Sequence, residues 1–245
     1  MTRFRTLLAI LAVALSVVVA AFLIWAYTPA SPMAEAYAAL QPDPTVSVRT
    51  DRWLEFSPAK GVPDTGLIFY QGGRVDARVY APPARRIAQE GYLVVIIPMP
   101  LNLAVTNPNA AQEVITAYPS IQRWIIGGHS LGGSMAASFA RRHPSLVAGL
   151  VLWASYPAGS DDLSTSDLSV LSIYGSLDGL ATPAKIEASR PLLPPNTTFV
   201  AIQGGNHAQF GWYGEQSGDN PASITRQAQQ AQVVQSTLAF LTGIY

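Results

Sequence analysis

Short apolar runs alternate with helix-length amphipathic segments from Val46 to the C-terminus of the chain. Strands that alternate with helices in this way are typical of a mostly parallel sheet that helices cover on both faces. We therefore expect an α/β fold with a doubly wound sheet. The expected strands lie near 46–56, 66–71, 93–98, 123–128, 148–154, 169–174 and 198–203. The expected helices fit 82–90, 109–118, 131–142, 182–189 and 221–241.

The N-terminus carries an apolar run from Leu7 to Tyr27, in which Ser16 is the only polar interior position. At 1.5 Å per residue this run covers roughly 31 Å, which matches the hydrocarbon core of a bilayer. Arg3 and Arg5 precede the run, and the positive-inside rule keeps such arginines in the cytoplasm. We expect a single-pass transmembrane signal anchor, with the rest of the chain outside the cytoplasm.

Two other interpretations of the apolar run stay open. Small residues within 34–38 have the spacing of a signal-peptide cleavage site, and cleavage there would give a secreted protein. The run could also form a buried core helix, although such a helix needs no uniformly apolar surface. The expected organisation is an anchor or signal peptide over 1–27, a proline-containing spacer over 28–45 and one large folded domain over 46–245.

Residues 123–133 have the pattern of an apolar strand, a tight turn and the start of a helix. The turn, residues 128–132, matches G-x-S-x-G, which holds a serine at a strained strand-to-helix corner with its hydroxyl above the sheet. By itself the pattern would also fit a glycine-rich turn. The small residues over 134–140 favour the corner, because a helix that carries them can pack closely over the sheet. We therefore expect Ser130 to act as a nucleophile.

A serine hydroxyl needs a neighbouring imidazole as general base, and the chain has three histidines. His129 lies inside the turn, where its side chain should point away from the serine. His143 ends a predicted helix, where a cationic side chain suits the helix dipole. His207 lies in a glycine-containing loop that follows the last predicted strand. We expect His207 to be the base.

The imidazole in turn needs a carboxylate that fixes its tautomer and stabilises its charged form. Asp178 lies in the loop that leaves the predicted strand 169–174, and it completes the chain order Ser, Asp, His. Asp161, Asp162 and Asp167 are rivals, but they lie in a polar stretch that has the composition of a solvated loop. We expect Asp178 to be the catalytic acid.

Two backbone N–H groups should bind the negative charge that develops on the substrate oxygen. The N–H of Leu131 follows the nucleophile directly. Gly72 and Gly73 come after the predicted strand 66–71, where a glycine pair lets a backbone N–H approach a substrate. We expect the oxyanion hole to consist of Leu131 with either Gly72 or Gly73.

These motifs resemble those of the α/β-hydrolase superfamily. The runs 69–73, 128–133, 178–179 and 205–207 are similar to its compact, dienelactone-hydrolase-like branch, here with a serine nucleophile, and the resemblance covers residues 46–245. It implies the hydrolase fold and an esterase, lipase or peptidase activity. Dienelactone hydrolases themselves use a cysteine, which this chain lacks, so their substrate is not implied.

The substrate pocket is expected at the same end of the sheet, without a large lid. Only about a dozen residues separate the strands that end near Ala154 and begin near Leu168, which is too short for a separate cap. Apolar side chains could line the pocket, although side chains of this kind are equally often part of a core. They are Met99, Leu101, Trp153, Tyr156, Phe210 and Trp212.

The composition excludes several other kinds of chemistry and partner. The absence of cysteine excludes a thiol nucleophile, a disulfide and a thiolate zinc site. Fifteen Lys and Arg are balanced by fifteen Asp and Glu, which leaves no basic surface for nucleic acid. We expect no cofactor and no metal ion. The expected partners are a small-molecule ester and the bilayer.

The expected function is hydrolysis of carboxylic esters through an acyl-enzyme. Two alternatives stay open. The same residues could transfer the acyl group to an alcohol, or the chain could be a non-catalytic binding protein on a hydrolase scaffold.

Overall fold

Eight strands form a single mixed sheet in the computed structural model, which describes residues 2–244 and their side chains from Phe4 onward. Their order across the sheet is β1-β2-β4-β3-β5-β6-β7-β8. β2 pairs antiparallel with both β1 and β4, and all other neighbours are parallel. The strands are β1 Val46–Arg49, β2 Leu54–Pro58, β3 Thr65–Tyr70, β4 Leu93–Ile97, β5 Arg123–His129, β6 Gly149–Trp153, β7 Ser169–Gly175 and β8 Thr198–Ile202.

The segment 46–56, expected as one strand, instead forms the antiparallel pair β1 and β2. The chain reverses over Thr50, Asp51 and Arg52, three consecutive polar residues that interrupt the apolar alternation and favour a turn. Val46 and Phe56 are both fully buried, so each of the two strands contributes to the core. The pair extends the edge of the sheet next to β4.

Side chains of the central strands alternate between two separate apolar cores, one on each face of the sheet. In β3, Leu67 and Phe69 belong to the core that contains residues of α3 and α7. Ile68 and Tyr70 belong to the core that contains residues of α4 and α5. Helices therefore cover both faces, as expected for a doubly wound sheet.

The helices mostly follow the ranges expected from the sequence. They are α1 Thr2–Tyr27, α2 Ala34–Ala38, α3 Ala81–Gln89, α4 Ala111–Ala117, α5 Leu131–Arg142, α6 Pro183–Ser189 and α7 Arg226–Thr242. Short 3-10 segments are η1 Ala77–Tyr80, η2 Pro100–Asn102, η3 Ala104–Thr106, η4 Arg190–Leu192 and η5 Ala208–Phe210. The last helix begins five residues later than expected, because the Thr225 hydroxyl accepts from the N–H of Ala228 and caps it there.

The connection between β6 and β7 contains neither helix nor strand over residues 154–168. This segment is where an inserted cap would lie. The expectation of a fold without a large lid is therefore confirmed.

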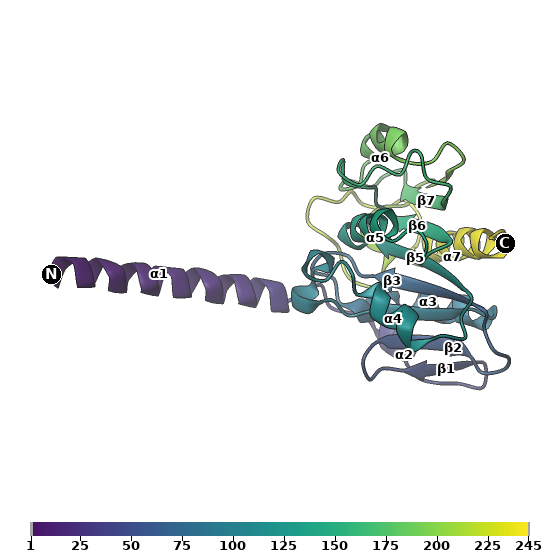
Figure 1. The fold of residues 1–245 in the computed structure, drawn as a ribbon, viewed down its shortest axis with the longest axis horizontal. Coiled ribbons are helices and arrows are strands. Elements are labelled where there is room, and N and C mark those ends of the chain that lie inside the picture. The colour runs from purple at the N-terminus through teal and green to yellow at the C-terminus, as the bar shows by residue number, and fades with distance from the viewer. Residues whose placement is uncertain (1, 245) are drawn as a thin grey trace.

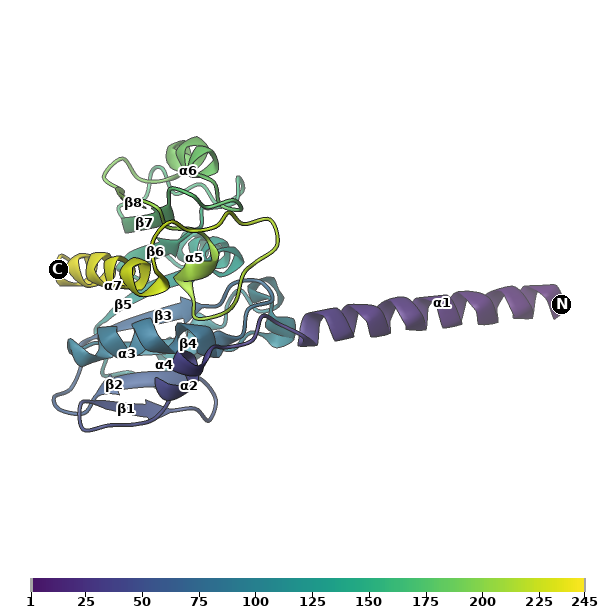
Figure 2. The same ribbon diagram turned by 180° about the vertical axis from the view of Figure 1, so that it is seen from behind.

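Helix α1 leaves the domain as a straight rod, on the side opposite to the C-terminus (Figures 1 and 2). Its segment Phe4–Tyr27 is long and apolar enough to cross a membrane, with a mean hydropathy of 3.1, and its most apolar window is not buried against the domain. A buried core helix is thereby excluded. The side chain of Arg3 lies outside the described side chains.

Residues 28–45, expected as a spacer, lie against the domain over much of their length. Ala30 forms a parallel bridge with Val75, and Pro32 forms an antiparallel bridge with Tyr213. The short α2 then packs on η1 and α3, where Ala36 is fully buried. The end of α1 is therefore held close to the folded domain.

The first turn of α5 lies against the backbone at the ends of β3 and β5. A Cβ on Gly132 would clash with the carbonyl oxygens of Tyr70 and Gln71, and one on Gly128 would clash with the backbone of Gly132. Both neighbours are main chain, so neither can rotate away. Glycine is required at these positions because the helix and the strands touch without intervening side chains.

We predict that Gly132→Ala lowers the free energy of unfolding by about 1–3 kcal/mol or more, because the added methyl group has no space. Gly159→Ala is the matched control, since a Cβ there would meet nothing within 4 Å. Urea unfolding of both variants in detergent, followed by circular dichroism, measures the difference. Equal stability of the two variants would refute the close contact between α5 and β3.

Candidate active site

Ser130 is the single residue between β5 and α5. Its backbone conformation is one that non-glycine residues rarely adopt. Its φ is 52° and its ψ is −124°, a strained combination that persists only where surrounding structure holds it. Its N–H donates to the carbonyl of Trp153 at 3.0 Å, and its own carbonyl accepts from the Ser155 hydroxyl at 2.6 Å. The strand-to-helix corner expected from the sequence is therefore present.

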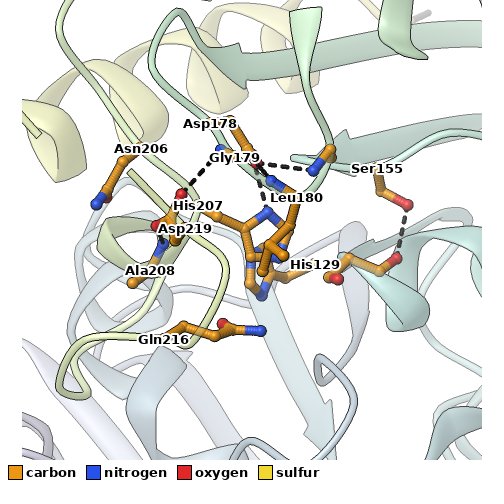
Figure 3. A network of polar contacts seen from close by, with 12 residues as sticks. His129, Ser155, Asp178, Gly179, Leu180, Asn206, His207, Ala208, Gln216 and Asp219 are labelled. Carbon is orange, nitrogen blue, oxygen red and sulfur yellow. Dashed lines mark hydrogen bonds and ion pairs between the residues drawn. The ribbon is translucent and has the colours of Figure 1, made fainter. Parts of the chain in front are cut away.

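His207 and Asp178 form a buried hydrogen-bonded pair. The Nδ1 of His207 lies 2.8 Å from the Oδ2 of Asp178, and both side chains are almost completely buried. The other carboxylate oxygen, Oδ1, accepts from the N–H groups of Leu180 at 2.8 Å and Ala181 at 2.7 Å. Figure 3 shows the carboxylate between the imidazole and this loop. With Nδ1 donating to Asp178, Nε2 of His207 is left as a proton acceptor.

One cavity of about 280 Å³ brings Ser130 and His207 together at the carboxyl ends of the strands. Its remaining lining residues are Leu131, Ser134, Ala154, Ser155, Tyr156, Leu180 and Ala181. Within the described part of the chain, Nε2 of His207 has no hydrogen-bond partner. Hydrogen bonds between a base and its nucleophile are often long in ligand-free sites and tighten when substrate binds. The cavity can therefore hold a small reactant beside a hydroxyl and a proton acceptor.

The two glycines expected near the oxyanion differ in their surroundings. The N–H of Gly72 donates to the Tyr80 hydroxyl at 3.0 Å. Gly73 lies beside Leu131, since a Cβ on it would be 3.2 Å from Cδ2 of Leu131. The N–H of Gly72 thus already has a hydrogen-bond partner in the protein interior, whereas Gly73 lies next to Leu131.

His129 is fully buried. The Tyr80 hydroxyl, which accepts from Gly72, lies 2.8 Å from Nδ1 of His129 and can donate only to it. This arrangement assigns the proton of the neutral imidazole to Nε2. Burial, and next the nearby His207, hold the pKa of His129 well below its ordinary value. His129 is thus a structural, neutral histidine, as its place inside the turn suggested.

Most of the apolar side chains expected in the pocket lie elsewhere. Met99, Trp153 and Phe210 are buried in the protein core, and Phe210 stacks on His129. Leu101 and Trp212 do not line the cavity at Ser130 either. Among the six, only Tyr156 does. Only Trp153 of the other five lies on a strand, β6, whereas the remaining four lie in the segments after β4 and β8.

Two polar residues that the sequence did not single out hold the loops of the buried pair. Asp219 accepts from the N–H of Gly179 at 3.0 Å and from the N–H of Ala208 at 2.9 Å, and so links the loops after β7 and β8 (Figure 3). Gln229 of α7 both accepts from and donates to the backbone of Asn206. Asp219 stands in a turn-like run of Gly, Asp, Asn and Pro, which gave no sign of this contact.

The part of the chain between residues 2 and 244 contains no group of three or more His, Asp or Glu side chains placed to hold a metal ion.

Comparisons with known proteins agree with this architecture. A sequence model of the alpha/beta hydrolase family matches residues 66–231, more than half of the chain. A proposed non-haem haloperoxidase of Mycobacterium phage D29 is 30% identical over 95 residues, which cover 35% of this chain and 34% of that protein. The chain spans about one third of the length of the curated relatives that it matches.

Solved structures share the fold at low sequence identity. A proposed dienelactone hydrolase of Klebsiella pneumoniae is 18% identical with a TM-score of 0.60, over 78% of this chain and 92% of that one. The esterase domain of a Rhodothermus marinus protein is 14% identical with a TM-score of 0.59, over 77% and 90% of the two chains. The fold class expected from the sequence, and the resemblance on which it partly rested, are confirmed.

The buried state of His129 generates a prediction about pH. Because its folded pKa lies below the unfolded value of about 6.5, the unfolded chain binds an additional proton as the pH falls. The corresponding stability is complete above about pH 6.5 and is lost below it, by up to about 1.4 kcal/mol per pH unit. We predict that His129→Gln makes the decline in unfolding free energy between pH 7 and pH 5 shallower. Chemical unfolding in detergent at several pH values measures the slope, and an unchanged slope would contradict the assignment.

Proposed function

The chain belongs to the alpha/beta hydrolase family, and on that premise we propose that it is a serine hydrolase that cleaves carboxylic esters. The observation that carries the proposal is the buried hydrogen bond between His207 and Asp178. It leaves Nε2 of His207 without a partner, and His207 lines the same cavity as Ser130. A base that activates a hydroxyl needs both a carboxylate that orients its ring and a ring nitrogen that is free to accept a proton.

In the proposed first half-reaction, Oγ of Ser130 attacks the ester carbonyl while Nε2 of His207 takes the hydroxyl proton. The carbonyl oxygen becomes an oxyanion, which the N–H groups of Leu131 and Gly73 bind. We assign Gly73 rather than Gly72, because the N–H of Gly72 already donates to Tyr80. The ester C–O bond then breaks, and His207 returns the proton to the leaving alcohol.

In the second half-reaction, water takes the place of the alcohol. His207 removes a proton from the water as it attacks the acyl-enzyme, and then gives that proton to Oγ of Ser130 as the acid leaves. Asp178 stays ionised throughout and stabilises the imidazolium, a role supported by the two N–H donors on its Oδ1. The site is thereby restored.

We further propose that α1 is a retained signal anchor. Its length and apolar surface suit a bilayer, and Arg3 and Arg5 at its start favour a cytoplasmic N-terminus. The hydrolase domain then lies outside the cytoplasm. The contacts of residues 28–45 with the domain support retention, because cleavage between 34 and 39 would remove the bridges made by Ala30 and Pro32.

We predict that Ser130→Ala abolishes labelling by a fluorophosphonate probe and lowers kcat for a soluble nitrophenyl ester by several orders of magnitude, about 10³-fold or more. Ser138→Ala, about two turns further along α5, is the matched control and should retain both. Folding of each variant is checked by its unfolding transition. If Ser130→Ala keeps more than about a tenth of the activity, Ser130 is not the nucleophile.

The topology gives a separate prediction. Full-length protein should sediment with membranes and resist extraction by alkaline carbonate, and a protease added outside the cytoplasmic membrane should digest the domain. A tag before Arg3 should stay protected from the same protease. Recovery of a soluble mature protein that begins near residue 37 or 39 would show cleavage, and digestion of the tag alone would show the reverse orientation.

A further inference from the structure

The end of α1 is attached to the loop that follows β3, directly beside the proposed oxyanion glycine. Arg74 donates through Nε to the carbonyl of Trp25 and through Nη2 to the carbonyl of Thr28, each at 2.8 Å. Its guanidinium also lies 4.5 Å above the Trp25 ring. Carbonyls at a helix C-terminus lack partners within the helix, so a cation that caps them stabilises the attachment.

A second loop, the one that follows β4, holds the same helix end. Nδ2 of Asn102 donates to the carbonyl of Ala26 at 3.0 Å, and its Oδ1 accepts from Gln71 at 3.2 Å. Ala26 is fully buried, unlike the rest of the apolar helix. Two loops therefore bind the end of α1. The side chains of Arg74 and Asn102, rather than a flexible linker, set the direction of the helix relative to the domain.

The loops after β3 and β4, which bind α1, lie at the carboxyl edge of the parallel strands, and so do Ser130 and His207. Figures 1 and 2 show α1 projecting away from the domain while the C-terminus lies at the opposite end. When α1 crosses a bilayer, the edge that carries the cavity therefore faces the membrane surface. The exposed side chain of Val105, in η3 on this edge, is 54% accessible and would add an apolar contact with lipid.

The size of the cavity limits what can enter it from that side. Its volume of about 280 Å³ lies below the range of roughly 300–1,000 Å³ that encloses a drug-sized ligand. No inserted cap covers it, since residues 154–168 form a plain connection. The site can enclose a short acyl group while a larger remainder of the same molecule stays outside.

We propose that the substrate is a short-chain acyl ester of an amphiphile that resides in the membrane into which α1 is inserted. The inference rests on the proposed ester hydrolysis and adds the place from which the substrate comes. The amphiphile keeps its apolar part in the bilayer, and its acyl group reaches Ser130 across the short distance between the lipid surface and the cavity.

The test uses full-length protein in phospholipid vesicles that contain an acetyl ester of a fluorogenic phenol, linked to a phospholipid headgroup. One version has a spacer that reaches roughly 10 Å, and the other has a spacer of more than roughly 50 Å, longer than a domain of this size is wide. A water-soluble ester of the same phenol reports activity that does not depend on the membrane.

We expect the short-spacer ester to be cleaved at least as fast as the long-spacer ester, and roughly tenfold or more above the soluble ester at equal total concentration. Cleavage of the long-spacer ester alone would overturn the inference, because the site would then face away from the bilayer. Turnover of the soluble ester separates the two failures. If no ester is cleaved and Ser130 is not labelled by the probe, the proposed function itself fails.

A double variant, Arg74→Ala with Asn102→Ala, tests whether the hydrogen bonds to the end of α1 orient the domain. Releasing the helix should lower the ratio of short-spacer to long-spacer cleavage by about threefold or more, as the domain samples other orientations. Arg78→Ala is the matched control, because Arg78 pairs with Asp76 rather than with α1, and it should keep the wild-type ratio. An unchanged ratio in the double variant would show that these two side chains do not orient the domain.

Discussion

Backbone contact at the start of α5 is the constraint on which the rest of the site depends. Gly128 and Gly132 bring the first turn of the helix against the ends of β3 and β5, where no Cβ fits. This contact holds Ser130 in its strained conformation and places Leu131 beside Gly73. A side chain at either glycine would move the helix N-terminus away from the loop after β3. The close packing at these glycines therefore also determines the positions of Ser130 and Leu131.

Burial of the pair formed by His207 and Asp178 is accompanied by side-chain hydrogen bonds to the backbone of both of their loops. Polar groups lose much free energy in the interior unless they find partners. Asp219 supplies partners to the backbone of both loops, and Gln229 supplies them to Asn206. Each loop is short and irregular, yet its backbone has few alternatives to this arrangement. The strands place the two residues at the carboxyl edge of the sheet, and the polar side chains around them fix their orientation.

Periodicity and glycine-rich turns were enough to predict the mostly parallel sheet and to place Ser130, Asp178 and His207 after β5, β7 and β8. These signals are local, because they depend on residues a few positions apart. The contacts of Asp219 join parts of the chain 11 and 40 positions away, and nothing in the surrounding turn reveals them. The reversal at residues 50–52 depends in the same way on the pairing of β1 with β2, and the burial of Phe210 on its stacking against His129. Three-dimensional partners, rather than composition, decide such features.

The hydrogen bonds from Gly72 to Tyr80 and from Tyr80 to His129 all point the same way. If Nδ1 of His129 carried the proton instead, the Tyr80 hydroxyl would accept from both groups, and its own proton would have no acceptor among the hydrogen bonds of the described residues. The N–H of Gly72, in the loop after β3, thus helps to determine which nitrogen of the buried His129 ring carries the proton. Because the pKa of that ring is held well below its ordinary value, His207, whose ring centre is 4.5 Å from that of His129, packs against a neutral neighbour. Protonation of His207 in the proposed mechanism would therefore place no second positive charge beside it.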